Sequence, residues 1–196
     1  MNVLRMALIA GALALSSAVD AQTAVRLRGT ITAVDVNTLA VKSREGQDLR
    51  LMLDDNLGVT VAKAIRFEDI KQGDYVGSAA TKRPDGTLVA LEVHYLPPAA
   101  AAGHTPWDLQ PGSTMTNANV EAIVQSAGKR DVTLRYKDGE QKIVVPEGVP
   151  IVRAVPGSRA DLVVGEYVFV AAQPAPDGKL TALRIQVSKD GVKPPM

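Results

Sequence analysis

The side chains that could bind a metal ion lie in the middle of the chain. His94 and His104 are the only histidines of the 196-residue sequence, and Asp108 and Met115 follow closely. Histidine is the commonest metal ligand in proteins, and methionine binds cuprous copper. Metal handling is therefore one hypothesis for this segment. The alternative is a solvated strand histidine and a second histidine packed beside the tryptophan, because the spacing matches no established ligand motif.

A second hypothesis is a recognition surface around Trp107, the only tryptophan. A flat indole beside hydroxyl, amide and carboxylate groups is typical of binding surfaces, and loops carry function more often than scaffolds do. The same segment also fits a structural clasp, in which Trp107 packs between domains while Asp108, Ser113 and Thr114 satisfy backbone groups of turns. The residues assigned to a ligand-binding or partner-binding site are His104, Trp107, Asp108, Ser113, Thr114, Met115, Thr116 and Asn117.

Composition argues against several kinds of chemistry. The chain has no cysteine, which excludes disulfides, thiolate metal sites and cysteine nucleophiles. Its net charge is only +1 and it has one Trp, four Tyr and two Phe, so the positive track and stacking aromatics that bind nucleic acid are not indicated. Ser113 and His104 are present, but nothing in the sequence shows a base oriented by a third group. We therefore expect a protein that is not an enzyme and uses no cofactor.

These residues are positioned by a repeat, which is the strongest signal in the sequence. A shift of 92 positions aligns residues 69–93 with residues 161–185 without a gap, and 12 of the 25 aligned positions are identical. A fixed internal period is the first indicator of architecture. Because two copies are too few for a solenoid, we interpret the repeat as an internal duplication of a small domain.

Short strand patterns separated by turn residues fill both copies. Apolar residues alternate in DLRLML (48–53) as in a half-buried strand, and Pro84-Asp85-Gly86 predicts a hairpin turn. Gly29 interrupts another strand pattern and indicates a bulge or a sharp bend. Residues 62–67 suggest one irregular helical turn. The expected fold class is all-β, with two tandem small β-barrels of the oligonucleotide-binding (OB-like) kind, closed so that no strand edge stays open.

The repeat also carries a resemblance to a known family. An opening G-x-I-x-x-V strand, a central G-D/E-Y-V pattern and a closing DG-x-L-x-A strand resemble the exported bacterial domains of unknown function numbered 5666. The second copy departs from this pattern at its opening, where no glycine stands in the place of Gly29. The resemblance implies tandem OB-like barrels outside the cytoplasm and implies no activity. The matching residues of the first copy are Gly29, Ile31, Val34, Asp69, Gly73, Asp74, Tyr75, Val76, Asp85, Gly86, Leu88, Ala90 and Val93.

Residues 1–21 have the form of a secretory signal peptide. An apolar run over residues 6–15 follows Arg5, and small residues near Ala21 predict cleavage before Gln22. The run is too short to span a bilayer, so an uncleaved membrane anchor is the less favoured alternative. No later apolar run reaches membrane-spanning length. We expect a periplasmic or secreted protein without a transmembrane span in its mature form.

Five regions are predicted along the chain, and they lead to two functional hypotheses. The leading hypothesis is a non-enzymatic periplasmic binding or adaptor protein that uses the connector to bind a protein, an envelope component or a small molecule, and not a nucleic acid. The alternative is a metal-handling accessory that uses His94, His104, Asp108 and Met115. The regions are a signal peptide (1–21), a first β-barrel repeat (22–96), a connector (97–117), a second β-barrel repeat (118–190) and a tail (191–196).

Overall fold

The computed structural model describes residues 24–126 and 128–195. Within these ranges the chain forms β-strands and two short 3-10 helices, η1 (Phe67–Asp69) and η2 (Arg159–Asp161), and contains no α-helix. The all-β fold expected from the sequence is confirmed. The predicted signal peptide lies outside the described residues. No helix in the described part of the chain is long and apolar enough to cross a membrane.

Twelve strands form one hydrogen-bonded network among the described residues. Strands β4 and β5 begin 92 positions before β11 and β12, so the sequence repeat is also a repeat of structure. The strands of the first copy are β1 (Val25–Val34), β2 (Thr38–Ser43), β3 (Asp48–Ala64), β4 (Tyr75–Lys82) and β5 (Leu88–Tyr95). They are followed by β6 (Gly103–Pro106), β7 (Ser113–Ser126), β8 (Lys129–Tyr136), β9 (Gly139–Val144), β10 (Ile151–Pro156), β11 (Tyr167–Pro174) and β12 (Leu180–Val187).

Strand β3 is longer than the sequence pattern indicated. The helical turn expected over residues 62–67 is wrong, because β3 continues as extended chain to Ala64. Beyond Gly58 the strand contains no glycine or proline, and Val59 and Val61 are buried in an apolar core. Alternating buried valines favour an extended chain over a turn of helix.

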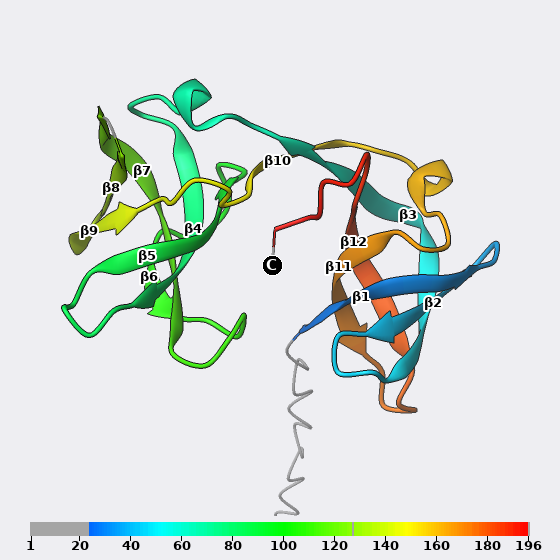
Figure 1. The fold of residues 1–196 in the computed structure, drawn as a ribbon. Helices are drawn as coiled ribbons and strands as arrows, with labels where there is room; N and C mark the ends of the chain where they lie inside the picture. Colours follow the sequence, from blue (N-terminus) through cyan, green and yellow to red (C-terminus); the bar gives the residue numbers. More distant parts are fainter. Residues whose placement is uncertain (1–23, 127, 196) are drawn as a thin grey trace, which may run out of the picture.

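The strands close into two barrels that stand side by side (Figure 1). Barrel A consists of β1, β2, β3, β12 and β11, in that order around the barrel. Barrel B consists of β7, β8, β9, β5 and β4, with β6 paired to the outside of β7. One parallel pair closes each barrel, β3–β12 in barrel A and β5–β9 in barrel B. Closed five-stranded barrels of this kind are the small OB-like barrels that the sequence predicted.

Each barrel encloses its own apolar core, which is the main source of its stability. The two cores share no buried residue. Fully buried members of the barrel A core include Ile31, Leu39, Leu51, Val170 and Ile185. Fully buried members of the barrel B core include Val76, Val93, Val120, Leu134 and Ile143.

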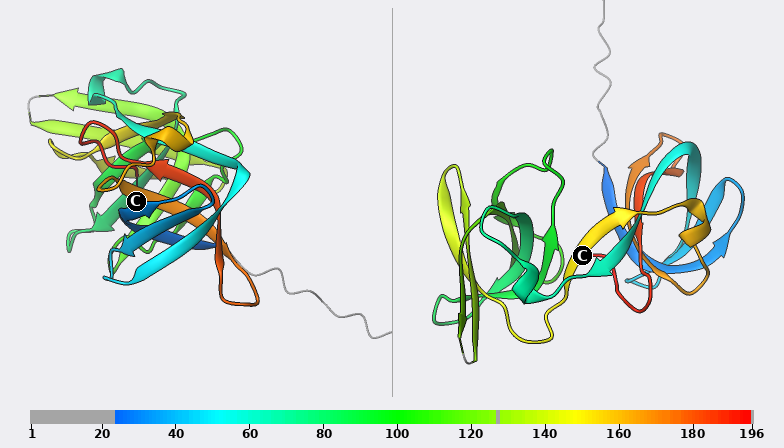
Figure 2. Two further views of the ribbon diagram at one scale, coloured as in Figure 1. Left: turned by 90° about the vertical axis from the view of Figure 1, so that its right-hand side faces the viewer. Right: turned by 90° about the horizontal axis from the view of Figure 1, so that it is seen from above.

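The two copies of the sequence repeat do not coincide with the two barrels. Residues 22–96 place β1 to β3 in barrel A but β4 and β5 in barrel B, and residues 118–190 divide their strands in the opposite sense. The ranges 22–96 and 118–190 are therefore sequence repeats and not separate barrels. Each repeat gives its last two strands to the barrel that contains the first three strands of the other repeat. The exchange arises because β3 crosses from one barrel towards the other without a turn (Figure 2).

The crossing is symmetric. Strand β3 pairs antiparallel with β10, and the central pair of the ladder is Ala62 with Ala154, two residues 92 positions apart. Thr60 pairs with Pro156 and Ala64 pairs with Val152, so the register is the same when read from either copy. A pseudo-two-fold axis therefore passes through the centre of the β3–β10 pair and relates barrel A to barrel B.

Gly29 is needed for the close approach of two strands. A Cβ atom at this position would lie 2.2 Å from the backbone oxygen of Lys42 on β2. The register shift between β1 and β2 falls slightly later, between Ile31 and Ala33. The bulge that the sequence indicated is thus present close to Gly29. The glycine itself is required because any side chain there would clash with the backbone of β2.

Engineered disulfides distinguish exchanged strands from tandem barrels. Val25 on β1 pairs with Ala172 on β11, and Ala80 occupies the position of Ala172 in the first copy. We expect Val25→Cys with Ala172→Cys to form an intramolecular disulfide on oxidation, because directly paired residues lie within disulfide range. Val25→Cys with Ala80→Cys, the matched control, should stay reduced. Mass spectrometry under non-reducing conditions measures both, and cross-linking of only the control pair would contradict the exchange.

Candidate functional site

A cleft of about 830 Å³ lies between the two barrels. The β3–β10 pair forms its floor through Thr60, Arg153 and Ala154. Barrel B contributes a wall from β5 and β7, and barrel A contributes a wall from β11 and β12. Pro195 from the C-terminal tail also lines the cleft, and Pro194 before it is buried, so the tail lies between the barrels.

The barrel B wall is built on Gly77. This residue pairs with His94 on β5 and with Asn117 on β7, which places all three in one row across the sheet. A Cβ atom at Gly77 would lie 2.6 Å from His94 Nε2 and 2.9 Å from Asn117 Oδ1. The glycine thus leaves room for the imidazole and the amide to lie over β4, next to each other and facing barrel A.

The barrel A wall has an equivalent row with different side chains. Phe169 pairs with Arg28 on β1 and with Gln186 on β12. The shift of 92 positions relates Phe169 to Gly77 and Gln186 to His94. The two walls therefore share one backbone arrangement but differ chemically. Barrel A has a phenylalanine and a glutamine at the positions where barrel B has a glycine and a histidine.

Two amide oxygens at the cleft are buried and have no hydrogen-bond partner in the described part of the chain. They are Asn117 Oδ1 and Gln186 Oε1. The other end of the Asn117 amide donates from Nδ2 to the carbonyl of Ala101 at 3.1 Å, which fixes the orientation of the group. Buried polar atoms are nearly always paired with protein, water or ligand. Both residues line the cleft, so these two oxygens are acceptors in its walls that the described residues leave unused.

Glu92 is a buried carboxylate on β5 of barrel B, with only 3% of its surface exposed. Its Oε1 lies 3.4 Å from Nδ1 of His94, whose imidazole is about seven-eighths buried. Because the two residues are two positions apart on β5, the carboxylate lies beside the imidazole on the same face of the strand. The contact is electrostatic, since His94 Nδ1 forms no hydrogen bond among the described residues, and the ring lines the cleft.

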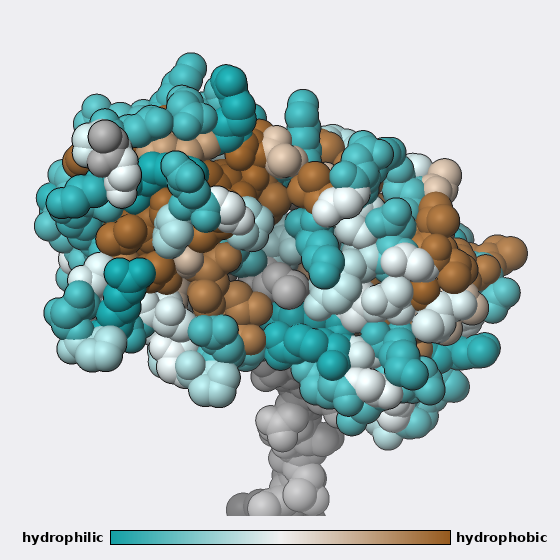
Figure 3. Space-filling view, in the orientation of Figure 1, coloured by the Kyte–Doolittle hydropathy of each residue, from teal (hydrophilic) through white to brown (hydrophobic). Residues whose placement is uncertain are grey.

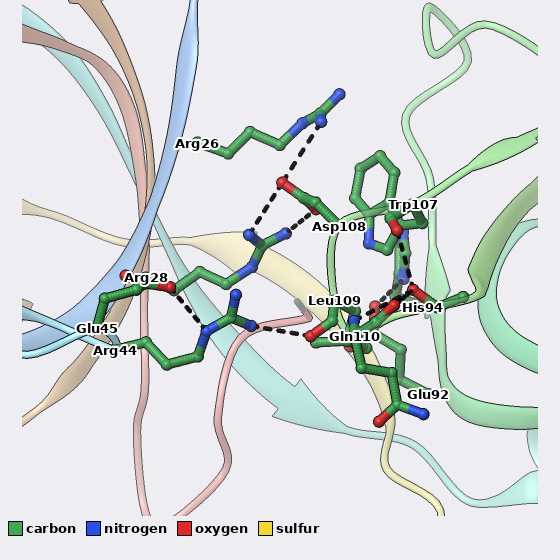
Figure 4. Close-up of polar contacts among 11 residues, drawn as sticks. Arg26, Arg28, Arg44, Glu45, Glu92, His94, Trp107, Asp108, Leu109 and Gln110 are labelled. Atoms are coloured by element: carbon green, nitrogen blue, oxygen red, sulfur yellow. Dashed lines mark hydrogen bonds and ion pairs between the residues drawn. The ribbon is translucent and has the colours of Figure 1, made fainter.

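The connector joins the barrels through Trp107 and Asp108 (Figure 4). The guanidinium of Arg26 lies over the indole of Trp107, 4.3 Å from the ring centroid. The buried Arg28 donates two hydrogen bonds to the carboxylate of Asp108, at 2.8 and 3.3 Å. Arg44 donates to the carbonyl of Leu109 at 3.0 Å. These contacts hold the connector of barrel B against β1 and β2 of barrel A, as a clasp across the gap.

Ser113 closes the loop that carries the clasp. Its hydroxyl donates to the carbonyl of Gln110 at 2.7 Å and lies 3.0 Å from the carbonyl of Trp107. The backbone N–H of Trp107 donates to the carbonyl of Ser113 at 2.9 Å. The sequence prediction that Ser113 satisfies turn backbone groups is correct, whereas Asp108 bonds to arginines of the other barrel instead.

The clasp changes the ionisation of Asp108. Partial burial alone would raise the pKa of this carboxyl, but the hydrogen bond from Arg28 and the positive charges of Arg28 and Arg26 outweigh it. The pKa of Asp108 is therefore lower than its ordinary value. A lowered carboxylate pKa means that the ion pair stabilises the folded state above the unfolded-state pKa and ceases to do so as the pH falls through the folded-state value.

The structure divides the residues predicted from the sequence. Trp107, Met115 and Asn117 line the cleft, and Asp108 and Ser113 build the clasp. The hydroxyl of Thr114 is buried without a hydrogen-bond partner among the described residues. His104 and Thr116 bind each other, with 2.8 Å between Nδ1 and Oγ1, and burial lowers the pKa of His104.

The proposed metal ligands do not come together. His94 pairs in the row of Asn117, whereas His104 pairs with Thr116, the preceding residue of β7. Successive residues of a strand point to opposite faces, so the two histidines lie on opposite faces of the sheet. Within residues 24–126 and 128–195, no group of three or more His, Cys, Asp or Glu side chains is arranged to hold a metal.

The residues of the barrel A wall were not predicted from the sequence. Phe169, Arg184 and Gln186 all line the cleft, and none of them was singled out. The repeat contained part of the necessary signal, because Gln186 is the equivalent of His94 and Arg184 is the equivalent of Glu92. Projecting the candidate His94 onto the second copy would have identified Gln186, whereas Glu92 was not a candidate and so gave no indication of Arg184.

Removal of the Asp108 charge tests the clasp. Asp108→Asn leaves the buried Arg28 without its carboxylate, and we expect the free energy of unfolding to fall by about 1.5 kcal/mol at pH 7, the lower end of the range for hydrogen bonds to charged groups, because the Asp108 side chain is 47% exposed. The matched control is Asp55→Asn, whose side chain is 99% exposed and which should change little. Chemical denaturation measures both. The difference between wild type and Asp108→Asn should shrink on acidification, and a constant difference would contradict the role of this ion pair.

Comparison with known proteins gives one family match. The model of a domain of unknown function (DUF5666) matches residues 28–94 and 153–186, just over half of the 196-residue chain. No curated protein and no solved structure matches the chain. The first matched segment includes strands β2 to β4 entirely and β5 up to His94, and the second runs from β10 into β12, so both copies of the repeat are involved. The resemblance noted in the sequence is confirmed, and the chain belongs to the DUF5666 family.

Proposed function

We propose that this protein is an exported, non-enzymatic binding protein that holds a small molecule in the cleft between its barrels. The observation that carries the proposal is the cleft itself, with Trp107 and Phe169 in its lining and two buried amide oxygens that lack partners. Its volume of about 830 Å³ falls in the range of small-molecule sites.

The lining has the composition of a ligand site. Apolar and aromatic side chains predominate, among them Met115 and Ile185 as well as the two aromatic rings. A few polar groups lie between them, which is how small-molecule sites combine affinity with a fixed ligand orientation. In Figure 3, apolar residues gather on barrel B next to the hollow between the barrels, and the adjoining surface of barrel A is mainly hydrophilic.

The placement of Ser113 and His104 supports binding over catalysis. The hydroxyl of Ser113 is committed to the backbone of its own loop, and the imidazole of His104 contacts Thr116. A nucleophile and a general base would have to lie within hydrogen-bond reach of each other. Each of these two side chains has a structural partner instead.

The clasp relates the connector to binding in a second way. Trp107 contacts Arg26 of barrel A on one hand and lines the cleft on the other. Both hypotheses drawn from the sequence for this tryptophan, a clasp and a recognition surface, are therefore compatible in one arrangement. A ligand in the cleft would contact the clasp directly, and its binding would strengthen the association of the barrels.

Blocking the cleft tests the binding proposal. Gly58 lines the cleft, and a Cβ atom there would have no heavy atom within 4 Å, so Gly58→Phe adds a bulky ring without a clash at the backbone. The matched control is Met52→Phe, on an exposed position of the same strand. Native mass spectrometry after incubation with a small-molecule filtrate of cell envelopes should show a bound mass for wild type and for Met52→Phe. We expect at least a ten-fold lower occupancy for Gly58→Phe, because the ring occupies the ligand volume.

Two results of this experiment would contradict the proposal. One is the absence of any bound mass on the wild-type protein. The other is equal occupancy of wild type and Gly58→Phe, provided that circular dichroism shows both to be folded.

Export is tested by the N-terminus of the mature protein. The proposal rests on the leader of residues 1–21. After expression with the leader in a Gram-negative host, intact mass should correspond to a chain that begins at Gln22 and is released by osmotic shock. A cytoplasmic protein that retains Met1 would contradict export.

A further inference from the structure

The fixed charges that line the cleft have one sign. Among the described residues of the lining, the two that carry a permanent charge are both arginines, Arg153 and Arg184, and no Asp or Glu is present. The nearest buried carboxylate, Glu92, lies beside His94 and outside the lining. A low-dielectric cleft with one sign of charge concentrates ligands of the opposite sign.

Two other arginines near the cleft share one carboxylate partner. Arg26 and Arg28 both lie within ion-pair distance of Asp108, at 3.7 and 2.8 Å. Arg184 differs from them, because its guanidinium forms no ion pair or hydrogen bond among the described residues and the residue is exposed on β12. The guanidinium of Arg153 stacks over the ring of Tyr95, 3.9 Å from the ring centroid. Among the described residues no carboxylate forms an ion pair with it.

The tyrosine beneath Arg153 does not supply the missing negative charge. Burial, followed by the hydrogen bond to Asp74 and the charge of that carboxylate, raises the pKa of Tyr95 to about 12. Its hydroxyl donates to Asp74 at 2.7 Å, on the side away from barrel A. The positive charge of Arg153 at the floor of the cleft is thus balanced by no group of the lining.

The position of Arg184 is where the two copies of the repeat differ most in charge. Its equivalent in the first copy is Glu92, which is 3% exposed and pairs with His94. In barrel A the equivalent of His94 is Gln186, whose neutral amide carries no charge that could balance Arg184. One wall of the cleft is therefore internally balanced, and the other keeps an unpaired cation.

Building on the proposed function, we infer that the ligand of the cleft is an organic anion with a flat, aromatic body. Arg184 and Arg153 bind its carboxylate, sulfonate or phosphate group through charge-assisted hydrogen bonds. Trp107 and Phe169 bind its ring system, since flat aromatic surfaces pack well on each other. Asn117 Oδ1 and Gln186 Oε1 accept hydrogen bonds from its hydroxyl or N–H groups.

A pair of probes that differ only in charge tests the inference. Naphthalene-2-carboxylate and its neutral analogue naphthalene-2-carboxamide have the same ring system and nearly the same size. Isothermal titration of the mature wild-type protein should show that the carboxylate binds about ten-fold more tightly, the effect of one charge-assisted hydrogen bond. The preference should weaken as salt is added, because part of it is electrostatic at an exposed arginine.

Arginine variants assign the preference to the cleft. Arg184→Gln should remove most of the ten-fold preference for the carboxylate while leaving the affinity for the carboxamide unchanged. The matched control is Arg50→Gln, an exposed arginine on β3 outside the cleft, which should bind both probes as wild type does. Both changes are at exposed strand positions, and thermal melting verifies that the variants fold.

The outcomes separate this inference from the proposed function. Equal affinity for the two probes, or an unchanged preference in Arg184→Gln, would overturn the anionic class of ligand and leave cleft binding intact. If neither probe binds while the envelope filtrate still yields a bound mass, the class is wrong and the proposed function stands. If Gly58→Phe binds the carboxylate as tightly as wild type, the anion site lies elsewhere and the inference fails.

Discussion

The antiparallel pair of β3 and β10 is the interaction on which the rest of the structure depends. It is centred on Ala62 and Ala154, and every strand exchange follows from it. Because β3 stays extended past Gly58, the chain leaves barrel A and enters barrel B, and β10 makes the reverse crossing. The same pair forms the floor of the cleft. If β3 turned back instead, each repeat would close on itself and the cleft would have no common base.

The two barrels have similar apolar cores but different side chains on the walls that face each other. Inside, both barrels pack aliphatic residues of similar size at equivalent positions. Outside, Gly77 is replaced by Phe169, His94 by Gln186 and Glu92 by Arg184. Core positions are constrained by packing, whereas an outward position is free to change unless it contacts something. The difference between the walls makes the cleft chemically asymmetric.

Much of the fold could be predicted from the sequence. Alternating apolar residues and turn residues such as Pro84-Asp85-Gly86 predicted strands and hairpins correctly, and the repeat predicted two equivalent barrels. The pairing of the copies could not be predicted. Strands β4 and β11 share Tyr, Val and two alanines at equivalent positions, and their inward-facing residues are similar, so β1 could pair with either strand. Only the absence of a turn after Gly58 selects between them, and that segment was misread as a turn of helix.

The candidate site was predicted only in part for the same reason. Trp107 and Asn117 belong to a connector that stands out by composition, and both lie at the cleft. The opposing wall comes from the far end of the chain and has an unremarkable strand sequence. A site formed between barrels depends on how strands are exchanged, and local sequence patterns carry no information about exchange.

The strands of barrel B lie in the sequence between strands of barrel A, and this order affects when each barrel can close during folding. All the strands of barrel B lie between β3 and β11, so that barrel can close as soon as its own residues are available. Barrel A needs both β1 and β12, the first and last of the described strands, so it closes only when segments about 150 residues apart have come together. Until then β1 and β2 present unpaired edges and bare apolar faces, which are the usual starting points of aggregation. Barrel A therefore passes through a longer interval than barrel B in which strand edges and apolar faces are unprotected.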